Sequence, residues 1–200
     1  MAHNLKNMPG YTQFINTKFV DIKLAETVEI YTGLYVRNAK TVLLKSVAFN
    51  KYIYVTTNGA LHMSSHAKGL KPLFGIIQTA NDETGMPIPI ITFGNKVNFK
   101  NTKYKRYITA EPDGSAVADR AILGVWEQFT IVSAEGASTG ERVTVNSKVG
   151  LLSDHNKYLV GEKDGTVNAN RIKLGAWEQF QIIVPDLGPE GGYDYDSQGA

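Results

Sequence analysis

A repeat of about 50 residues is the feature of this sequence that most restricts its fold. The segment from Tyr107 to Phe129 recurs without a gap as the segment from Tyr158 to Phe180, at an offset of 51 residues, with about half of the positions identical. Self-similarity at such a period indicates one supersecondary unit that is used several times and buries its apolar face against its copies.

A weaker third copy lies upstream, at an offset of 55 residues. It keeps the tyrosine, the two glycines and the apolar strand residues of the second copy, at Tyr52, Gly59, Gly69, Phe74 and Ile76. The segment 71–73, Lys-Pro-Leu, stands where the other copies have Trp-Glu-Gln. The chain therefore holds three units.

Each unit is predicted to form short strands joined by tight turns. Asn58-Gly59, Asp113-Gly114 and Asp164-Gly165 favour hairpins, because these pairs accept positive φ at low cost. Segments such as 97–100, 106–110, 129–132 and 142–145 are rich in β-branched and aromatic residues or alternate at a period of two. No helical pattern runs long enough to predict a helix.

Three units of four short strands predict an all-β chain with a single β-trefoil. A propeller needs at least four blades, whereas a closed barrel removes the unpaired edges of a three-copy sheet. The predicted trefoil spans 28–184, with units at about 42–96, 97–148 and 149–184, the last completed by 28–41. An apolar N-terminal arm (1–27) and an acidic, Gly-rich tail (185–200) lie outside it.

The last copy resembles the repeat of fascin-like β-trefoils of the actin cross-linking-like superfamily. The shared pattern is lysine–tyrosine–leucine at 157–159, Glu162, a glycine turn, valine–asparagine–alanine at 167–169, then Trp177 and Glu178 before an apolar strand. The resemblance covers about 155 residues and implies the trefoil fold and a role in binding actin filaments. A single trefoil would need two actin sites, or dimerisation, to cross-link filaments.

Composition excludes several classes of function. The chain has no cysteine, so thiol catalysis, thiolate metal sites and disulfides are absent. Its net charge of +2 is too balanced for a dedicated nucleic-acid-binding protein. No apolar run approaches the roughly 18 residues of a membrane span, and no secretory signal is visible. We therefore expect a cytoplasmic protein that binds no nucleic acid and has no membrane span.

The tryptophans of the repeat have two interpretations. Trp126 and Trp177 could stack on sugar rings, but their place beside repeated Gly and Phe favours a core role with Glu127 and Glu178 outside. The expected structural core of the repeat consists of Tyr52, Tyr107, Tyr158, Trp126, Trp177, Phe74, Phe129 and Phe180.

The sequence contains no recognisable set of catalytic or metal-binding residues. Glu111 and Glu162 are symmetry copies and should lie too far apart for paired acid–base work. His62 and His66 have a metal-binding spacing only on a helix, and they follow a turn. We therefore expect no enzyme activity, no metal and no cofactor.

The strongest charge feature is the run from Lys100 to Arg106. Its candidate partner-binding residues are Lys100, Lys103, Tyr104, Lys105 and Arg106, which could grip an acidic partner; the alternative is a solvated hairpin. Two long loops, 78–87 and 133–141, could form an acidic rim through Asp82, Glu83, Glu135 and Glu141.

Three functions remain open from the sequence. The first is a protein-binding module of the actin cross-linking kind, which rests on the resemblance and on the basic run. The second is a carbohydrate-binding trefoil lectin. The third is a structural subunit that forms a homo-oligomer of its own copies through residues 1–27 and 185–200.

Overall fold

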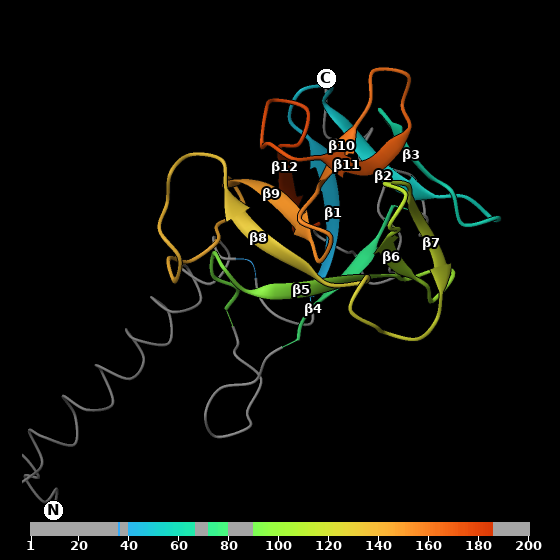
Figure 1. Cartoon of the computed structure of the whole chain (residues 1–200), viewed down its shortest axis with the longest axis horizontal. Helices are drawn as coiled ribbons and strands as arrows, with labels where there is room; N and C mark the ends of the chain where they lie inside the picture. Colours follow the sequence, from blue (N-terminus) through green and yellow to red (C-terminus); the bar gives the residue numbers. More distant parts are fainter. Residues whose placement is uncertain (1–35, 37–39, 67–71, 80–89, 186–200) are drawn as a thin grey trace, which may run out of the picture. The chain divides into compact units, whose positions relative to one another are not determined.

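The computed structural model describes Val36 and residues 40–66, 72–79 and 90–185 (Figure 1). Within these ranges the chain is all-β and contains no helix, so no described helix could cross a membrane. The twelve strands are β1 (Lys40–Ser46), β2 (Lys51–Val55), β3 (Leu61–Ser64), β4 (Phe74–Gln78), β5 (Lys96–Asn101), β6 (Tyr107–Ala110), β7 (Ala116–Arg120), β8 (Phe129–Ser133), β9 (Lys148–Ser153), β10 (Tyr158–Gly161), β11 (Val167–Arg171) and β12 (Phe180–Ile183).

Six of these strands form a closed antiparallel barrel. Going around it, β1 pairs with β4, β4 with β5, β5 with β8, β8 with β9, β9 with β12, and β12 with β1 again. The other six strands are three hairpins, β2–β3, β6–β7 and β10–β11, which continue from β1, β5 and β9 (Figure 1). Closure leaves the barrel without a free edge.

The barrel interior is filled by side chains that alternate along the strands. The first residues of β4, β8 and β12 are Phe74, Phe129 and Phe180, and each is fully buried. The rings of Phe99 and Phe129 lie 6.4 Å apart, centroid to centroid. Burying each such side chain stabilises the fold by about 1.5–3 kcal/mol, so the apolar residues of the repeat supply a shared core.

The three hairpins are joined to one another at their glycine turns. Gly59, Gly114 and Gly165 have φ angles of 88°, 91° and 93°. The carbonyl of Gly59 accepts a hydrogen bond from the Ala118 N–H at 2.7 Å, that of Gly114 from Ala169 at 2.8 Å, and that of Gly165 from Met63 at 2.7 Å. Each hairpin therefore binds the next one in a cycle.

The prediction of a trefoil with three four-stranded units is wrong. The units do not close on themselves: β12 pairs directly with β1, and all twelve strands belong to one continuous sheet. Segment 142–145, expected to be a fourth strand, forms no regular strand: Arg142 makes an isolated bridge with Thr92, and the Val143 N–H donates to the Ile91 carbonyl at 2.9 Å. The fold is a closed six-stranded antiparallel barrel with extra strands.

The predicted contribution of 28–41 as a fourth strand for the last unit falls mostly on 28–35 and 37–39, which lie outside the described residues. From this segment the structure describes Val36, which is buried and lies between Val143 and Ile91 through backbone hydrogen bonds of 2.9 Å. Lys40 and Thr41 already belong to β1. The predicted arm 1–27 and the tail from residue 186 onward lie outside the described residues.

Candidate functional site: the basic turn between β5 and β6

Asn101, the last residue of β5, fixes the turn that follows it. Its side-chain oxygen accepts hydrogen bonds from the backbone N–H groups of Lys103 and Tyr104 at 3.1 and 3.0 Å. Its side-chain amide donates to the carbonyl of Leu73 at 3.2 Å, which ties the turn to the segment before β4. We call Lys100, Lys103, Tyr104, Lys105 and Arg106 the basic turn.

Lys105 has an unusual backbone conformation, with φ at 58°. The equivalent residues of the β1–β2 and β9–β10 turns are Asn50, at 53°, and Asn156, at 56°. Asparagine tolerates this left-handed conformation, whereas most L-residues lose roughly 1–2 kcal/mol in it. The second repeat therefore places a lysine where the other two have the residue that suits the turn.

Two ammonium groups of the basic turn lie over tyrosine rings. The Nζ atom of Lys100 lies 4.8 Å from the ring centroid of Tyr107, and that of Lys103 lies 5.5 Å from that of Tyr104. Lys103 and Lys105 are exposed, and Lys100 and Arg106 are half-buried. The rings restrict the lysine side chains without neutralising their charge.

None of the four cations of the basic turn forms an ion pair with a described residue. Elsewhere Arg120 pairs with Glu111 at 2.6 Å, Arg171 with Glu162 at 2.7 Å, and Lys148 with Glu135 at 3.0 Å. The structure thus places the sequence-predicted partner-binding residues on one turn, and their charges have no ion-pair partner among the described residues.

Tyr104 occupies a position where the other repeats have an aromatic contact with tryptophan. Phe49 packs on Trp177 and His155 on Trp126, both at 5.4 Å between ring centroids. In the first repeat Lys71 stands at the position of the tryptophan that would contact Tyr104, and Lys71 lies outside the described residues. The Tyr104 hydroxyl is buried and has no hydrogen-bond partner in the described part of the chain. This junction therefore differs from the other two.

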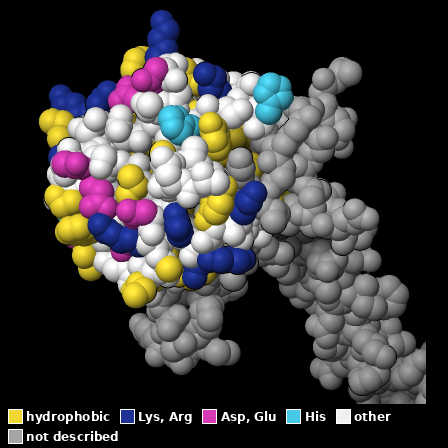
Figure 2. Space-filling view, turned by 90° about the vertical axis from the view of Figure 1, so that its right-hand side faces the viewer, with side chains coloured by type: hydrophobic (Ala, Val, Ile, Leu, Met, Phe, Trp, Pro, Cys, Tyr) yellow, Lys and Arg dark blue, Asp and Glu magenta, His cyan; other side chains and the backbone are white. Residues whose placement is uncertain are grey.

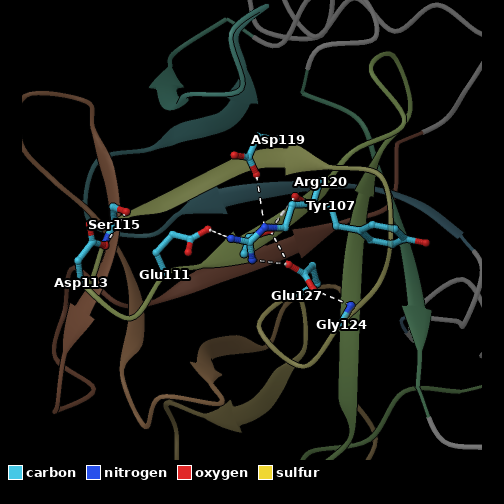
Figure 3. Close-up of polar contacts among 9 residues, drawn as sticks. Tyr107, Glu111, Asp113, Ser115, Asp119, Arg120, Gly124 and Glu127 are labelled. Carbon is cyan, nitrogen blue, oxygen red and sulfur yellow. Dashed lines mark hydrogen bonds and ion pairs between the residues drawn. The ribbon is translucent and has the colours of Figure 1, made fainter.

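A second polar arrangement involves the conserved positions of the repeat (Figure 3). Arg120 donates to Glu111 at 2.6 Å and to Glu127 at 3.2 Å, and Thr109 donates to the same Glu127 oxygen at 2.9 Å. The guanidinium also lies 5.0 Å from the Trp126 ring. Burial disfavours the charge of Arg120, but its hydrogen bonds to the two glutamates raise its pKa above the ordinary value.

The same arrangement recurs in the last repeat. Arg171 donates to Glu162 at 2.7 Å and lies 3.8 Å from a Glu178 oxygen. The other Glu178 oxygen accepts from the Gly175 N–H at 2.8 Å. Because each carboxylate is bound to groups of its own repeat, the networks link β6 to the loop before β8, and β10 to the loop before β12. They stabilise the hairpins against these loops.

The burial of the tryptophan and glutamate side chains is the reverse of the prediction. Trp177 is 41% exposed and Trp126 is half-buried, whereas Glu127 is only 2% exposed and Glu178 is buried. The physical reason is that backbone N–H groups and arginine satisfy the carboxylates inside, as Gly124 does for Glu127 at 2.6 Å. Of the other expected core residues, Tyr52, Phe74, Phe129 and Phe180 are buried, and Tyr107 and Tyr158 are half-buried.

The remaining candidate groups do not assemble into a site in the described part of the chain. The His62 ring faces Tyr54 at 6.0 Å, and His66 contacts the Ser65 hydroxyl at 3.0 Å. Among the described residues no group of three His, Asp or Glu side chains could hold a metal. In the predicted acidic rim, Glu135 pairs with Lys148, which lowers the Glu135 pKa, while Asp82 and Glu83 lie outside the described ranges.

Exposed apolar side chains in the β7–β8 and β11–β12 loops were missed by sequence reasoning. Ile122, Val125 and Ile172 are exposed, Ile122 at 83%. The sequence could have indicated these exposed residues, because in both loops they lie close to the repeated Gly-x-Trp segment. On the face shown in Figure 2, hydrophobic, basic and acidic side chains lie interspersed, so no single-sign patch covers it.

Comparisons with known proteins address the fold alone. No protein-family model matches the chain, and neither does any curated protein. Among solved structures, a Caenorhabditis elegans protein of unknown function matches with a TM-score of 0.64 and 8% identity, over 74% of this chain and 95% of that one. The SDF2-like protein from Arabidopsis thaliana matches with a TM-score of 0.61 and 7% identity, over 74% and 94%. This chain thus shares its barrel with the SDF2-like protein, and neither neighbour is described as fascin-like.

Proposed function

We propose that this chain is a non-catalytic binding module whose basic turn docks on an acidic surface of a protein partner. The observation that carries the proposal is the set of four cations, Lys100, Lys103, Lys105 and Arg106, on one turn without a described acidic partner. Clustered, uncompensated cations attract a surface of opposite charge and speed its association.

The conformation of Lys105 supports a role for the turn beyond folding. Asn at this position would suit the backbone better, as the other two repeats illustrate. A residue held in a sparsely populated conformation is a pointer to function when a better-suited residue was available. Lys105 adds an exposed charge at the tip of the turn, which asparagine would not supply.

The first partner to test is the actin filament, because the sequence resemblance to fascin-like repeats implies it. One barrel with one basic turn gives one docking surface. Binding without bundling is therefore the expected behaviour of the monomer, and bundling requires a dimer or a second surface.

The test is co-sedimentation with filaments at low and at physiological salt. We expect the protein to pellet at low salt, and the double variant Lys103→Glu/Lys105→Glu to lose at least ten-fold in affinity. The matched control is Lys163→Glu/Lys173→Glu, which changes the net charge equally at two exposed lysines that form no ion pair with a described residue, and it should keep its affinity. An equal loss in both variants would overturn the role of the basic turn, and no pelleting at low salt would overturn actin as the partner.

A second candidate function, carbohydrate binding, is favoured by the exposed Trp177. Its ring is accessible at the surface and is held by Phe49, and an exposed indole face is a surface on which sugar rings stack. A glycan array tests this candidate, with Trp177→Ala expected to lose any signal and Ile172→Ala, at an exposed position of the same loop, expected to keep it. An array without signal would end this alternative.

A further inference from the structure

We propose that the docking surface of the basic turn continues onto the loop between β7 and β8, where Ile122, Leu123 and Val125 form its apolar part. We call these three residues the apolar loop. The partner that fits the combined surface is a folded protein with an apolar patch beside its carboxylates. The role of the apolar loop rests on the proposed function, because both parts of the surface meet the same partner.

The aliphatic side chains of the apolar loop are exposed to solvent. The exposed fraction is 83% for Ile122, 57% for Val125 and 38% for Leu123. Single apolar residues scattered over a surface are ordinary, whereas neighbouring ones form a patch, and such patches mark interaction sites. Contact with an apolar surface of a partner would remove these side chains from water, which favours binding.

The strand register places the apolar loop beside the basic turn. Tyr107, the first residue of β6, pairs with Arg120, the last residue of β7. The basic turn ends at Arg106, directly before this pair, and the apolar loop begins with Ile122, shortly after it. The Cα path from Arg106 through the pair to Ile122 is at most about 17 Å long. A standard interface covers about 800 Å² on each partner, a circle about 30 Å wide, so one interface includes both.

Both parts of the surface distinguish the second repeat from the last one. In the last repeat Lys173 stands at the position of Ile122, and Ala176 at that of Val125. Its turn at 154–157 reads Asp-His-Asn-Lys, where the second repeat has its run of cations. The last repeat forms the same hairpin and loop without these residues, so the fold does not require them. Two departures at neighbouring places indicate a common role.

Hydrogen bonds and a ring contact order both parts of the surface before a partner arrives. The Glu127 carboxylate accepts from the Gly124 N–H at 2.6 Å, and the Gln128 side chain donates to the Gly124 carbonyl at 3.2 Å, which fixes the apolar loop. The ammonium group of Lys100 lies 4.8 Å from the ring centroid of Tyr107. A surface ordered in advance loses less entropy on binding. Such fixed positions favour a folded partner, because a fluid lipid surface does not need them.

The two parts contribute to binding in ways that salt separates. The cations of the basic turn attract carboxylates over a distance, and salt weakens this attraction. Burial of the apolar loop depends on the removal of apolar surface from water, which ordinary salt does not screen. The apolar loop therefore adds a part of the affinity that persists when salt has weakened the rest.

Co-sedimentation with actin filaments over a range of salt concentrations tests the apolar loop in the full chain. The variant Ile122→Ser should lose about five-fold or more in affinity at every salt concentration, because an aliphatic contact is lost. The slope of affinity against salt should stay that of the wild type. The matched control is Ile172→Ser, at an isoleucine of the β11–β12 loop that is 76% exposed, and it should bind as the wild type does. The variant Lys103→Glu/Lys105→Glu should instead have a smaller slope.

The outcomes separate the apolar loop from the proposed function. If the wild type binds filaments and Ile122→Ser binds equally well, the role of the apolar loop is overturned and the proposed function stands. An equal loss in Ile172→Ser would overturn that role in the same way. If the wild type does not pellet at low salt, both fail together. Vesicles of phosphatidylcholine and phosphatidylserine are the second probe: if they bind the wild type and Ile122→Ser weakens this binding, the surface meets a membrane, and the protein partner is overturned.

Discussion

The carboxylate of Glu127 accepts a hydrogen bond from the backbone N–H of Gly124 at 2.6 Å, inside the loop that joins β7 to β8. Its other oxygen is held by Thr109 and Arg120. The glutamate of the Trp-Glu pair thus organises the loop, and the tryptophan beside it packs on the outside.

Replacing Glu127 by alanine should lower the free energy of unfolding by about 2–4 kcal/mol. The change leaves the Gly124 N–H and the Thr109 hydroxyl without their buried acceptor and leaves Arg120 with one carboxylate fewer. Urea unfolding measures the loss. Asp119→Ala is the control, because Asp119 lies 4.0 Å from the same arginine but is exposed, and it should cost under about 0.5 kcal/mol. Equal losses would contradict this account of the loop.

Replacing Lys105 by asparagine should stabilise the protein by about 0.5–1 kcal/mol. The residue has φ at 58°, which asparagine adopts at lower cost than lysine. The same measurement on Lys103→Asn, which removes an equal charge without positive φ, should show no gain. We expect Lys105→Asn also to weaken binding to an acidic partner, so that stability and affinity change in opposite directions.

Replacing Gly59 by alanine should cost clearly more stability than replacing Gly136. Both residues have positive φ, at 88° and 83°, so both substitutions carry the backbone cost of roughly 1–2 kcal/mol. At Gly59 a Cβ atom would also lie 2.9 Å from the Ala118 carbonyl oxygen, whereas nothing lies within 4 Å at Gly136. Thermal unfolding of the two variants measures the difference, and a similar shift in Tm would show that the hairpins can move apart without cost.

Replacing Asn98 by valine should stabilise the protein by about 1–2 kcal/mol. Asn98 on β5 is 1% exposed, and neither atom of its amide group has a hydrogen-bond partner in the described structure. The equivalent position in β1 is Leu43, which is buried in an apolar cluster. Removing an unsatisfied buried amide recovers its desolvation cost. Urea unfolding should show the gain, with Asn98→Asp destabilising, and a loss with valine would reveal a partner of the amide.

Acidification should remove a stabilising contribution from two hairpin turns. The pKa of Asp113 is lowered by hydrogen bonds from the backbone and side chain of Ser115, and that of Asp164 by those from Thr166. A carboxyl whose pKa is lower in the folded state stabilises the fold above its unfolded pKa, and this contribution is lost as the pH falls through the folded pKa. The loss should appear between about pH 5 and pH 2.

The measurement for this prediction is the Tm as a function of pH in the wild type and in Asp113→Asn/Asp164→Asn. The double variant should have a shallower decrease in this range, since asparagine does not titrate. Parallel curves would mean that other carboxyls account for the acid sensitivity.

The repeat made the strand positions and the hairpin turns predictable. The Asn/Asp-Gly pairs lie at hairpin turns with positive φ, as the residue types indicate. The partner of each strand was not predictable in the same way, because pairing depends on contacts between residues as distant as Leu43 and Ile183. A local pattern indicates a strand but does not identify the strand with which it pairs.

The side-chain environment of the site was predictable only in part. The four cations of the basic turn could be identified from 100–106, but the absence of ion pairs with described residues required the structure. Glu127 is more buried than Trp126, which is the opposite of the usual preference of these residue types. It arises from an arginine, a threonine and a backbone N–H that come together only when β6, β7 and the following loop are folded.

The cyclic bonding of Gly59, Gly114 and Gly165 has a consequence for how the three copies can diverge. Each hairpin gives a hydrogen bond to one neighbour and receives one from the other, so a change at one glycine turn disturbs two interfaces at once. The turns between barrel and hairpin, at 46–51, 101–106 and 153–157, differ in sequence, and each contacts a neighbouring copy through its own side chains, as Phe49 does with Trp177 and Asn101 with the carbonyl of Leu73. The copies thus keep the same backbone contacts at the glycine turns and use different side chains where the barrel meets the hairpins.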